Sequence, residues 1–287
     1  MTISVSQKPT SLWSVLRNAH LSVVFSCLTL FIILLFALFG PMLLGLGNDI
    51  NPLSRLKPPS SEHFFGTDSV GREIFVRTIS GSRNSVVVGV SVAVLTLVLG
   101  GALGVFAGYF RLADKILMRI ADGLMAIPGV LFAIALVSLL GGGFLTVIIA
   151  ITIPEIPRTA RLMRSVVLTI RELPFVTASI AVGSSTPKIL LQHIIPNVVG
   201  ALTVQATFVC ASAVLSEAAL SFLGVGTPPD IPSWGNVMAS GRQFFQIAPW
   251  VILFPGALLS LMVLSVNILG DHLRDHLDPR LTKRRAS

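Results

Sequence analysis

Residues 158–197 read RTARLMRSVVLTIRELPFVTASIAVGSSTPKILLQHIIPN, a polar and basic stretch between long apolar runs. Pro174 and Gly183 bracket one short segment, which suits a helix because proline is favoured in the first helical turn and glycine just past the helix end. Pro187 opens a second short segment in the same way. The stretch therefore predicts two short helices joined by a bend at Gly183.

The composition outside this stretch is that of a membrane protein. Of 287 residues, 53% are hydrophobic and only 12% are charged, and the mean hydropathy is +0.84. A soluble domain has about 25% charged residues, so this chain has too few to cover a water-facing surface. Long uncharged runs extend over residues 21–48, 84–110, 123–154, 194–216 and 243–270. Because about 20 apolar residues cross a bilayer, we expect an all-α polytopic membrane protein.

Six transmembrane helices are expected. Five have the approximate ranges 21–44, 85–110, 116–140, 194–223 and 248–270, and the fourth in chain order begins at 144. Pro128 predicts a kink in the third helix. The fourth must continue through Arg158, Arg161 and Arg164, because the uncharged part, 144–154, is too short to cross a membrane.

The basic residues predict the orientation of these helices. The N-terminus, the 111–119 turn, the 158–188 segment and the C-terminal tail together carry 15 Lys and Arg, whereas the 45–83 and 224–247 loops carry 6. Positive charge is enriched on the cytoplasmic side, so both termini are expected there. The 158–196 segment is then cytoplasmic, where two short rigid helices on a bend suit the docking of a soluble partner. The five basic residues within 45–83 do not fit this orientation, because it places them outside the cytoplasm.

The centre of the stretch resembles the cytoplasmic EAA loop of ABC importer permeases, which reads Glu-Ala-Ala, three residues, Gly, nine residues, Ile-x-Leu-Pro. Ala178, Gly183 and Pro196 match this pattern, while Thr177 stands at the Glu and Ser179 at the second Ala. The alternative interpretation of this segment alone is an ordinary amphipathic surface helix.

Three further stretches extend the resemblance over nearly the whole chain. They are HFFGTDSVGRE at 63–73, EAALSFLGVG at 217–226 with the following Pro-Pro and Trp-Gly, and GDHLRDHLDPR at 270–280. In this order they resemble the "C" permease subunit of the dipeptide/oligopeptide/nickel family of ABC importers, with Glu73 in place of the usual Asp.

This resemblance implies a type I ABC importer (MetI-like) permease fold in a bacterial cytoplasmic (inner) membrane. It implies three regions: 1–83, with the cytoplasmic N-terminus, the first helix and an extracytoplasmic segment; 84–271, the ABC type-1 transmembrane domain with the coupling loop at about 158–196; and 272–287, a cytoplasmic tail.

The resemblance also implies the partners of the chain. They are a homologous permease subunit in a heterodimer, two ATP-binding subunits, an extracytoplasmic substrate-binding protein and membrane lipid, with no nucleic acid. The sequence has no G-x-x-x-x-G-K-[ST] phosphate loop, so ATP hydrolysis is expected on separate subunits. We expect no catalytic residue, no cofactor and no metal in this chain.

The resemblance makes Thr177, Ala178, Ser179, Gly183 and Pro196 the residues that couple the chain to the ATPase. Thr177 can form hydrogen bonds but cannot pair with a cation as the family Glu does. Gly183 is the residue on which the bend most depends, because a bend of this kind needs positive φ or close approach.

Two sets of residues keep two interpretations each. Asp68, Arg72 and Glu73 could shape the outer vestibule or bind the binding protein, or they could form an internal network in their loop. Glu217 is an acid inside an apolar run, and such acids usually face a cavity or a partner. It could line the translocation path and meet the ammonium group of a peptide, or it could pair with an Arg or backbone donor to fix the last two spans.

Two patterns have simpler interpretations. Gly100, Gly104 and Gly108 recur every four residues, and this spacing predicts close helix packing, within the subunit or against the partner permease. Arg158, Arg161 and Arg164 share one helical face, which predicts an anchor to anionic lipid headgroups.

The function expected is uptake of di- or oligopeptides by an ATP-driven importer. The same machinery could carry nickel or another small solute, such as glutathione or opines. An ion-coupled secondary transporter is the other class considered, but such proteins use inverted repeats and intramembrane ion sites. No such repeat is visible. A membrane enzyme lacks support, because no nucleophile–base pair or metal cluster stands at a span end.

Overall fold

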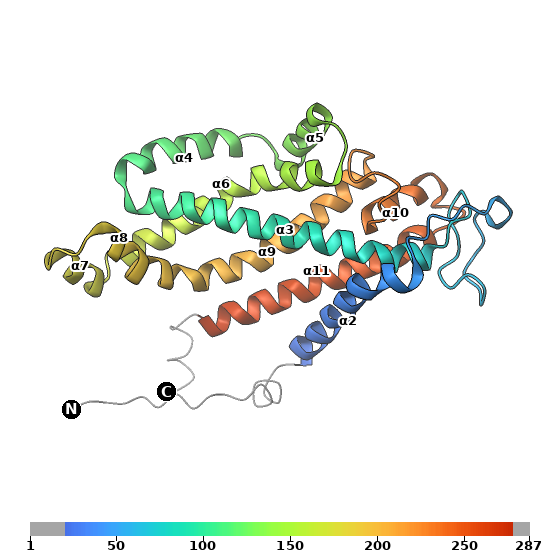
Figure 1. Cartoon of the computed structure of the whole chain (residues 1–287), viewed down its shortest axis with the longest axis horizontal. Coiled ribbons are helices and arrows are strands. Elements are labelled where there is room, and N and C mark those ends of the chain that lie inside the picture. The colour runs from blue at the N-terminus through green and yellow to red at the C-terminus, as the bar shows by residue number, and fades with distance from the viewer. Residues whose placement is uncertain (1–20, 278–287) are drawn as a thin grey trace.

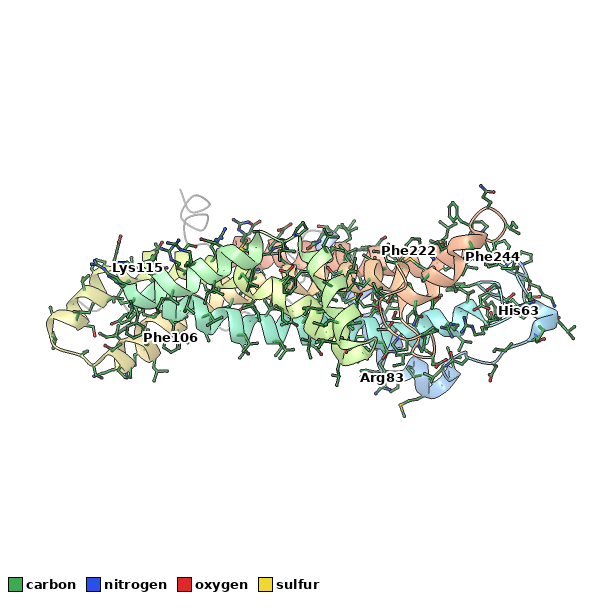
Figure 2. All side chains as sticks on the ribbon, turned by 90° about the horizontal axis from the view of Figure 1, so that it is seen from above. His63, Arg83, Phe106, Lys115, Phe222 and Phe244 are labelled. Atoms are coloured by element: carbon green, nitrogen blue, oxygen red, sulfur yellow. The ribbon has the colours of Figure 1, made fainter. Side chains whose placement is uncertain are left out.

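The computed structural model describes residues 21–277, and these form a bundle of long helices that run roughly parallel to one axis (Figure 1). The helices are α2 (Leu21–Leu44), α3 (Ile74–Tyr109), α4 (Arg111–Met125), α5 (Gly129–Leu140), α6 (Phe144–Arg171), α7 (Pro174–Ala181), α8 (Thr186–Ile189), α9 (Ile195–Phe222), α10 (Trp234–Gly241) and α11 (Trp250–Leu277). Helices α7 and α8 lie at one end of the bundle, and α10 and the 45–73 loop lie at the other. Lys115 and His63 lie toward these two opposite ends (Figure 2).

Four helical segments are long and apolar enough to cross a membrane. They are Leu21–Leu44, Ile74–Tyr109, Thr186–Phe222 and Trp250–His276, and the bent pair Arg111–Met125 with Gly129–Leu140 would make a fifth. The expected all-helical multi-span architecture is therefore confirmed for four or five spans. Helix α6 has 28 residues, or about 42 Å. It is long enough to cross, but its charged residues keep it out of the set that composition alone identifies.

The third predicted span is broken rather than kinked. Helices α4 and α5 meet at an angle of 85° across Pro128, whose backbone is extended with φ −54° and ψ 126°. Proline has no N–H to donate and clashes with the preceding turn, so α4 ends at Met125 and a new helix starts at Gly129. The predicted change of direction at Pro128 is confirmed, but it divides the span into two helices instead of bending one.

The second predicted span begins earlier than expected, at Ile74 instead of near Ser85. The extra helical turns bury small hydroxyl side chains, among them Thr78, Ser80 and Ser82. Their polarity hid this part of the helix from a search for apolar runs. The buried face of these turns packs against the loops at the end of the bundle that holds α10.

The glycine repeat on α3 packs against α6. A Cβ atom at Gly104 would lie 2.5 Å from the backbone oxygen of Ala160, and one at Gly108 would lie 2.6 Å from Cβ of Val167. Gly100 makes a similar close approach to the backbone of α6. The predicted close packing is confirmed within the subunit, since these glycines let the two helix backbones approach more closely than any side chain would allow.

The arginines on α6 have carboxylate partners inside the chain. Arg161 pairs with Asp122 and Arg164 pairs with Asp114, both on α4, while Arg158 pairs with Glu155 at 2.9 Å on α6 itself. Two of the three pairs therefore fix α4 along α6. The sequence did not predict these pairs, because the acids of α4 are adjacent in space although distant in sequence, and the anchoring of this face to lipid headgroups stays a prediction.

We predict that Gly104→Ala lowers the thermal stability of the purified protein. The new methyl group would press on the backbone of α6, and overpacking of this kind costs about 1–3 kcal/mol. The matched control is Gly123→Ala on α4, where a Cβ meets nothing within 4 Å. The control should be neutral or stabilising, since alanine is the better helix former. Equal melting temperatures for the two variants would contradict the packing assignment.

Candidate functional site

One candidate site is the bend between α7 and α8, at the end of the bundle opposite α10 (Figure 1). Gly183 follows α7 with φ +82°, a conformation that favours glycine. Its N–H donates to the oxygen of Ile180 at 2.9 Å, and the N–H of Ser184 donates to the oxygen of Ser179 at 3.1 Å. This pair of bonds is a Schellman motif, which satisfies the last carbonyls of a helix and turns the chain. The predicted first helix and the bend at Gly183 are confirmed, but the second helix is not short, because α8 continues through a π-helical turn at Leu190–Ile194 into α9, and Thr186–Phe222 is one helical segment.

The bend is fixed to the bundle by a small hydrophobic core. Val176, Ile189 and Ile194 are buried, and they pack with Met163, Val167, Ile170 and Val198 of α6 and α9. Helix α7 and the start of the 186–222 helix therefore share one core with α6 and α9. A force on α7 is transmitted to α6 and α9 because no flexible linker separates them.

The bend exposes three large apolar side chains beside polar ones such as Thr177 and Lys188. The side chains of Phe175, Ile180 and Val182 are 44%, 47% and 86% exposed. Exposed apolar groups gathered on a surface commonly mark an interaction site. This face is the part of the bend that is open to a partner.

The remaining coupling candidates lie on or beside this face. Thr177 is exposed and donates its hydroxyl to the oxygen of Pro174 at 3.0 Å, so it behaves as an intrahelical hydrogen-bond donor. Ala178 and Ser179 follow it on α7. Pro196 lies at the start of α9, directly after the π-helical turn Leu190–Ile194; a π turn is a common accommodation for a residue that cannot donate an N–H inside a helix. The structure places these residues on the two helices that flank the bend, and their contact with an ATPase stays a prediction.

The loop before α3 holds Asp68, Arg72 and Glu73 in internal pairs. Asp68 is fully buried. Its carboxylate accepts the backbone N–H groups of Val70 and Arg72 at 2.9 Å and pairs with the Arg72 guanidinium at 2.7 Å. Glu73 lies 2.6 Å from Nδ1 of His63. Gly66 and Gly71 supply the positive-φ turns. The internal network that one interpretation expected is present, and a role in binding another protein stays a prediction.

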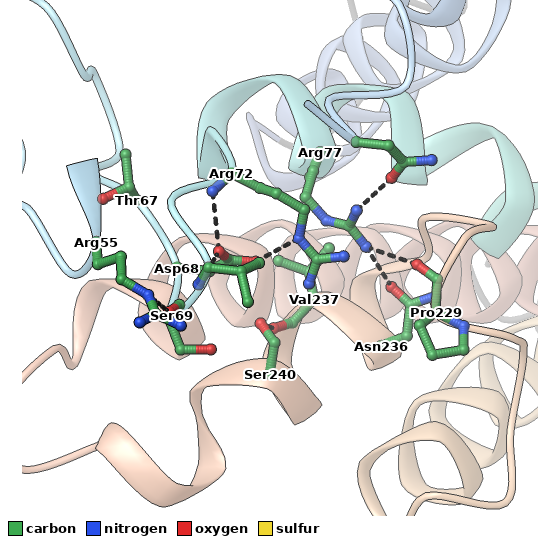
Figure 3. Close-up of polar contacts among 12 residues, drawn as sticks. Arg55, Thr67, Asp68, Ser69, Arg72, Arg77, Pro229, Asn236, Val237 and Ser240 are labelled. Carbon is green, nitrogen blue, oxygen red and sulfur yellow. Dashed lines mark hydrogen bonds and ion pairs between the residues drawn. The ribbon is translucent and has the colours of Figure 1, made fainter. Parts of the chain in front are cut away.

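A buried arginine joins this loop to the other loop at the same end of the bundle (Figure 3). Arg77 is 1% exposed and stands in the first turn of α3. Its guanidinium donates to the side-chain oxygen of Asn48, to the backbone oxygen of Pro229 at 3.0 Å and to the side-chain oxygen of Asn236 at 3.5 Å. Arginine suits this place because its planar fork reaches several acceptors at once.

Further contacts extend the same junction along α3. The N–H of Trp234 donates to the hydroxyl of Ser85 at 3.1 Å, and the indole N–H donates to the oxygen of Thr78 at 3.0 Å. Asn84 donates to the oxygen of Pro232 at 2.6 Å. The first three turns of α3 therefore hold the 228–236 segment by directed hydrogen bonds as well as by burial of the Trp234 ring.

Glu217 belongs to this buried network. One carboxylate oxygen accepts hydroxyl donors from Ser221 and Ser233 at 2.8 Å and from Thr227 at 3.3 Å. Ser233 in turn forms a capping box with Asn236 at the start of α10. These contacts support the interpretation that Glu217 fixes the end of α9, with hydroxyl donors in place of the expected Arg or backbone donor. The side chain is 0% exposed, which gives no support to direct contact with a solute.

Sequence reasoning missed two of these features. Arg77 was counted as a loop residue, but it is in α3. The apolar residues around it and the nearby Ser and Asn residues could have indicated a helix with a buried polar contact. Glu155 was overlooked as a second acid inside a span, because it stands beside Pro154 and Arg158 in a region taken as the polar end of a helix. Within residues 21–277, the structure has no group of three or more His, Cys, Asp or Glu side chains that could hold a metal ion.

The fold and these two ends define a helical, multi-span membrane protein. At one end is a hydrogen-bonded cap, made of the 45–73 loop, the start of α3, the end of α9 and the 227–236 segment. At the other end is an exposed helical bend. Comparison with known proteins adds the family. Residues 100–283 match the family described as "binding-protein-dependent transport system inner membrane component". The chain belongs to this family. It is thus a membrane component of an ABC transport system and not its ATPase, and membership implies ATPase and binding-protein partners.

Curated relatives and a solved structure agree with this assignment. The chain is 50% identical over 251 residues to a probable peptide ABC transporter permease protein of Sinorhizobium fredii, covering 88% of this chain and 86% of the relative. It is 39% identical over 285 residues to the oligopeptide transport system permease protein OppC of Bacillus subtilis, covering 97% and 93%. A chain of the inward-facing MetNI methionine ABC transporter aligns with a TM-score of 0.59 at 20% identity, covering 71% of this chain and 98% of that one. This last likeness concerns the fold alone, which is of the MetI type.

We predict that Arg77→Ala destabilises the protein strongly. Hydrogen bonds to a charged group are worth about 1.5–3 kcal/mol each, and buried acceptors would lose their donor. Arg77→Lys should recover little, because an ammonium group lacks the planar fork. The control is Arg83→Ala on the same helix, where the side chain is exposed and a change within about 0.5 kcal/mol is expected. Thermal unfolding of the purified variants checks this, and equal costs at the two positions would contradict the junction described above.

Proposed function

We propose that this chain is the permease subunit of an ATP-driven importer that takes up di- or oligopeptides. The observation that carries the proposal is the exposed, rigidly mounted bend at Gly183 in a chain of this family. Peptides are the proposed solute because the relatives from Sinorhizobium fredii and Bacillus subtilis are named as peptide and oligopeptide permeases. The translocation path would lie between this chain and a homologous permease in a heterodimer.

The topology proposed has six membrane crossings with both termini in the cytoplasm. Helices α2, α3, α9 and α11 would each cross once, the broken pair α4–α5 would supply a fifth crossing, and α6 a sixth. The charged face of α6 argues for its place in this set, because its arginines pair with acids of the same chain and ion pairing lowers the cost of charge at membrane depth. The basic residues within 45–83 argue less strongly against this orientation than their number suggests, since Arg72 and Arg77 are held by buried partners.

The α7–α8 bend is then the surface that the ATPase subunits bind. Its apolar face at Phe175, Ile180 and Val182 would enter a cleft on the ATPase. Its packing on α6 and α9 would convert closure of the ATPase pair into movement of these two helices. At the other end, the cap built on Arg77 and Asp68 would receive the substrate-binding protein.

We predict that Gly183→Arg abolishes uptake while the chain still inserts and folds. A Cβ atom at Gly183 meets nothing within 4 Å, so the side chain would project into the space where the partner binds. The substitution also forces a non-glycine residue to positive φ, at a cost of about 1–2 kcal/mol. The measurement is uptake of a labelled dipeptide together with ATP hydrolysis by the assembled complex, which should continue without transport.

Gly141→Arg is the matched control for this experiment. Gly141 has φ +85° and likewise meets nothing within 4 Å, but it lies between α5 and α6, away from the bend. Its ψ of 154° lies in a region that is essentially confined to glycine at positive φ, so the substitution strains the backbone there too, and coupling should nevertheless stay intact. Normal uptake with Gly183→Arg, or equal loss with both variants, would refute the assignment of the bend to ATPase coupling.

A further inference from the structure

A cavity of about 310 Å³ lies between the start of α5, the middle of α6 and the second half of α9. Its polar lining comes from Glu155, Arg158, Ser212 and Ser216, and its apolar lining includes Val130, Ala133, Ile151 and Leu220. The mixture of a few polar groups on an apolar wall is typical of a small-molecule site. A volume of this size is sufficient for a short peptide and excludes a folded partner.

The Glu155–Arg158 pair differs from the other two pairs on α6. Arg161 and Arg164 reach acids on α4 and so join two helices. Glu155 and Arg158 stand three residues apart on one helix, with 2.9 Å between their charged atoms, so their pair joins no two elements. Charged groups at membrane depth are costly and usually face a cavity or a path. This pair borders the cavity and has no evident structural task.

The burial of the two partners also suits a ligand site. The Glu155 side chain is 11% exposed, whereas that of Arg158 is 52% exposed. The carboxylate is therefore largely enclosed at the wall of the cavity, while half of the Arg158 side chain is accessible from outside the chain. Arg158 also lies beside Gly129, since a Cβ at Gly129 would be 3.8 Å from its Nη2 atom. The cavity thus reaches the break between α4 and α5, where the helix direction changes.

From this arrangement we infer that the cavity binds one short zwitterionic peptide during its passage, an inference that rests on the proposed import function. The carboxylate of Glu155 binds the peptide ammonium group, and the guanidinium of Arg158 binds its carboxylate as a charge-assisted, bidentate pair. A zwitterion exchanges the existing ion pair for two new ones, so neither protein charge is left unpaired. Ser212 and Ser216 offer hydroxyl groups to the peptide bond. Glu217, which lies one residue from Ser216, takes no part because its carboxylate belongs to the buried cap.

The test uses the full importer complex in lipid nanodiscs, with Ser216→Cys introduced after Cys27→Ser and Cys210→Ser. A membrane-impermeant thiosulfonate reagent should label this variant. Alanyl-alanine at millimolar concentration should slow the labelling several-fold, whereas N-acetyl-alanyl-alanine amide, which carries neither charge, should not. Ser61→Cys in the same background is the control, because it is exposed in the loop before α3, outside the spans, and its labelling should be insensitive to both peptides.

The variants Glu155→Gln and Arg158→Gln test whether these two charges bind the peptide. Each should abolish the protection by alanyl-alanine without changing labelling in the absence of peptide. If Glu155→Gln prevents assembly of the complex, Arg158→Gln still decides the question, because its side chain is half exposed. The inference is overturned if the reagent does not reach Ser216→Cys, if the two peptides protect equally, or if protection survives both substitutions.

Uptake of alanyl-alanine by the unmodified complex, driven by ATP, tests the proposed function separately. Uptake without charge-dependent protection would reject the cavity as a peptide site and leave the importer assignment standing. Absence of uptake for any peptide would reject the proposed function, whatever the labelling shows.

Discussion

The contact between α3 and α6 is the constraint on which the rest of the structure depends. Gly100, Gly104 and Gly108 leave no side chain between the two backbones, so the helices pack as closely as helices can. Helix α3 begins within the cap built on Arg77, and α6 leads into α7 and the bend at Gly183. The close packing therefore joins the two ends of the molecule through a pair of rigid rods.

The charged side chains of α6 and α9 are placed in three different ways. Arg161 and Arg164 pair with acids of α4 and hold the broken α4–α5 segment beside α6. Glu217 is surrounded by hydroxyl donors from its own helix and the following loop. The pair of Glu155 and Arg158 borders a cavity instead. Charge at membrane depth is costly, so each of these charged groups should have a structural or functional role. The arginine–acid pairs and Glu217 hold parts of this chain together, whereas the Glu155–Arg158 pair does not.

The two ends differ in how they are built, and this difference suits different partners. The cap is fixed by directed hydrogen bonds from Arg77, Asn84 and Trp234, which specify one arrangement of two loops. The bend at Gly183 is fixed by apolar packing below and left apolar above. A surface of this kind can be bound by a soluble protein. A movement of that protein can be transmitted to α6 and α9, because the packing beneath the surface is continuous with these two helices.

The sequence by itself determined the helical class, the limits of α2, the bend at Gly183 and the family signatures. These depend on local properties, namely the length of apolar runs, the conformational freedom of glycine, the missing N–H of proline and the order of short motifs. Only the tertiary structure decided that Arg77 is a buried junction, that Arg161 and Arg164 have partners on α4, and that Glu155 borders a cavity. Their partners or neighbours come from segments distant in sequence, and neither hydropathy nor spacing along one helix records which distant segment lies beside it.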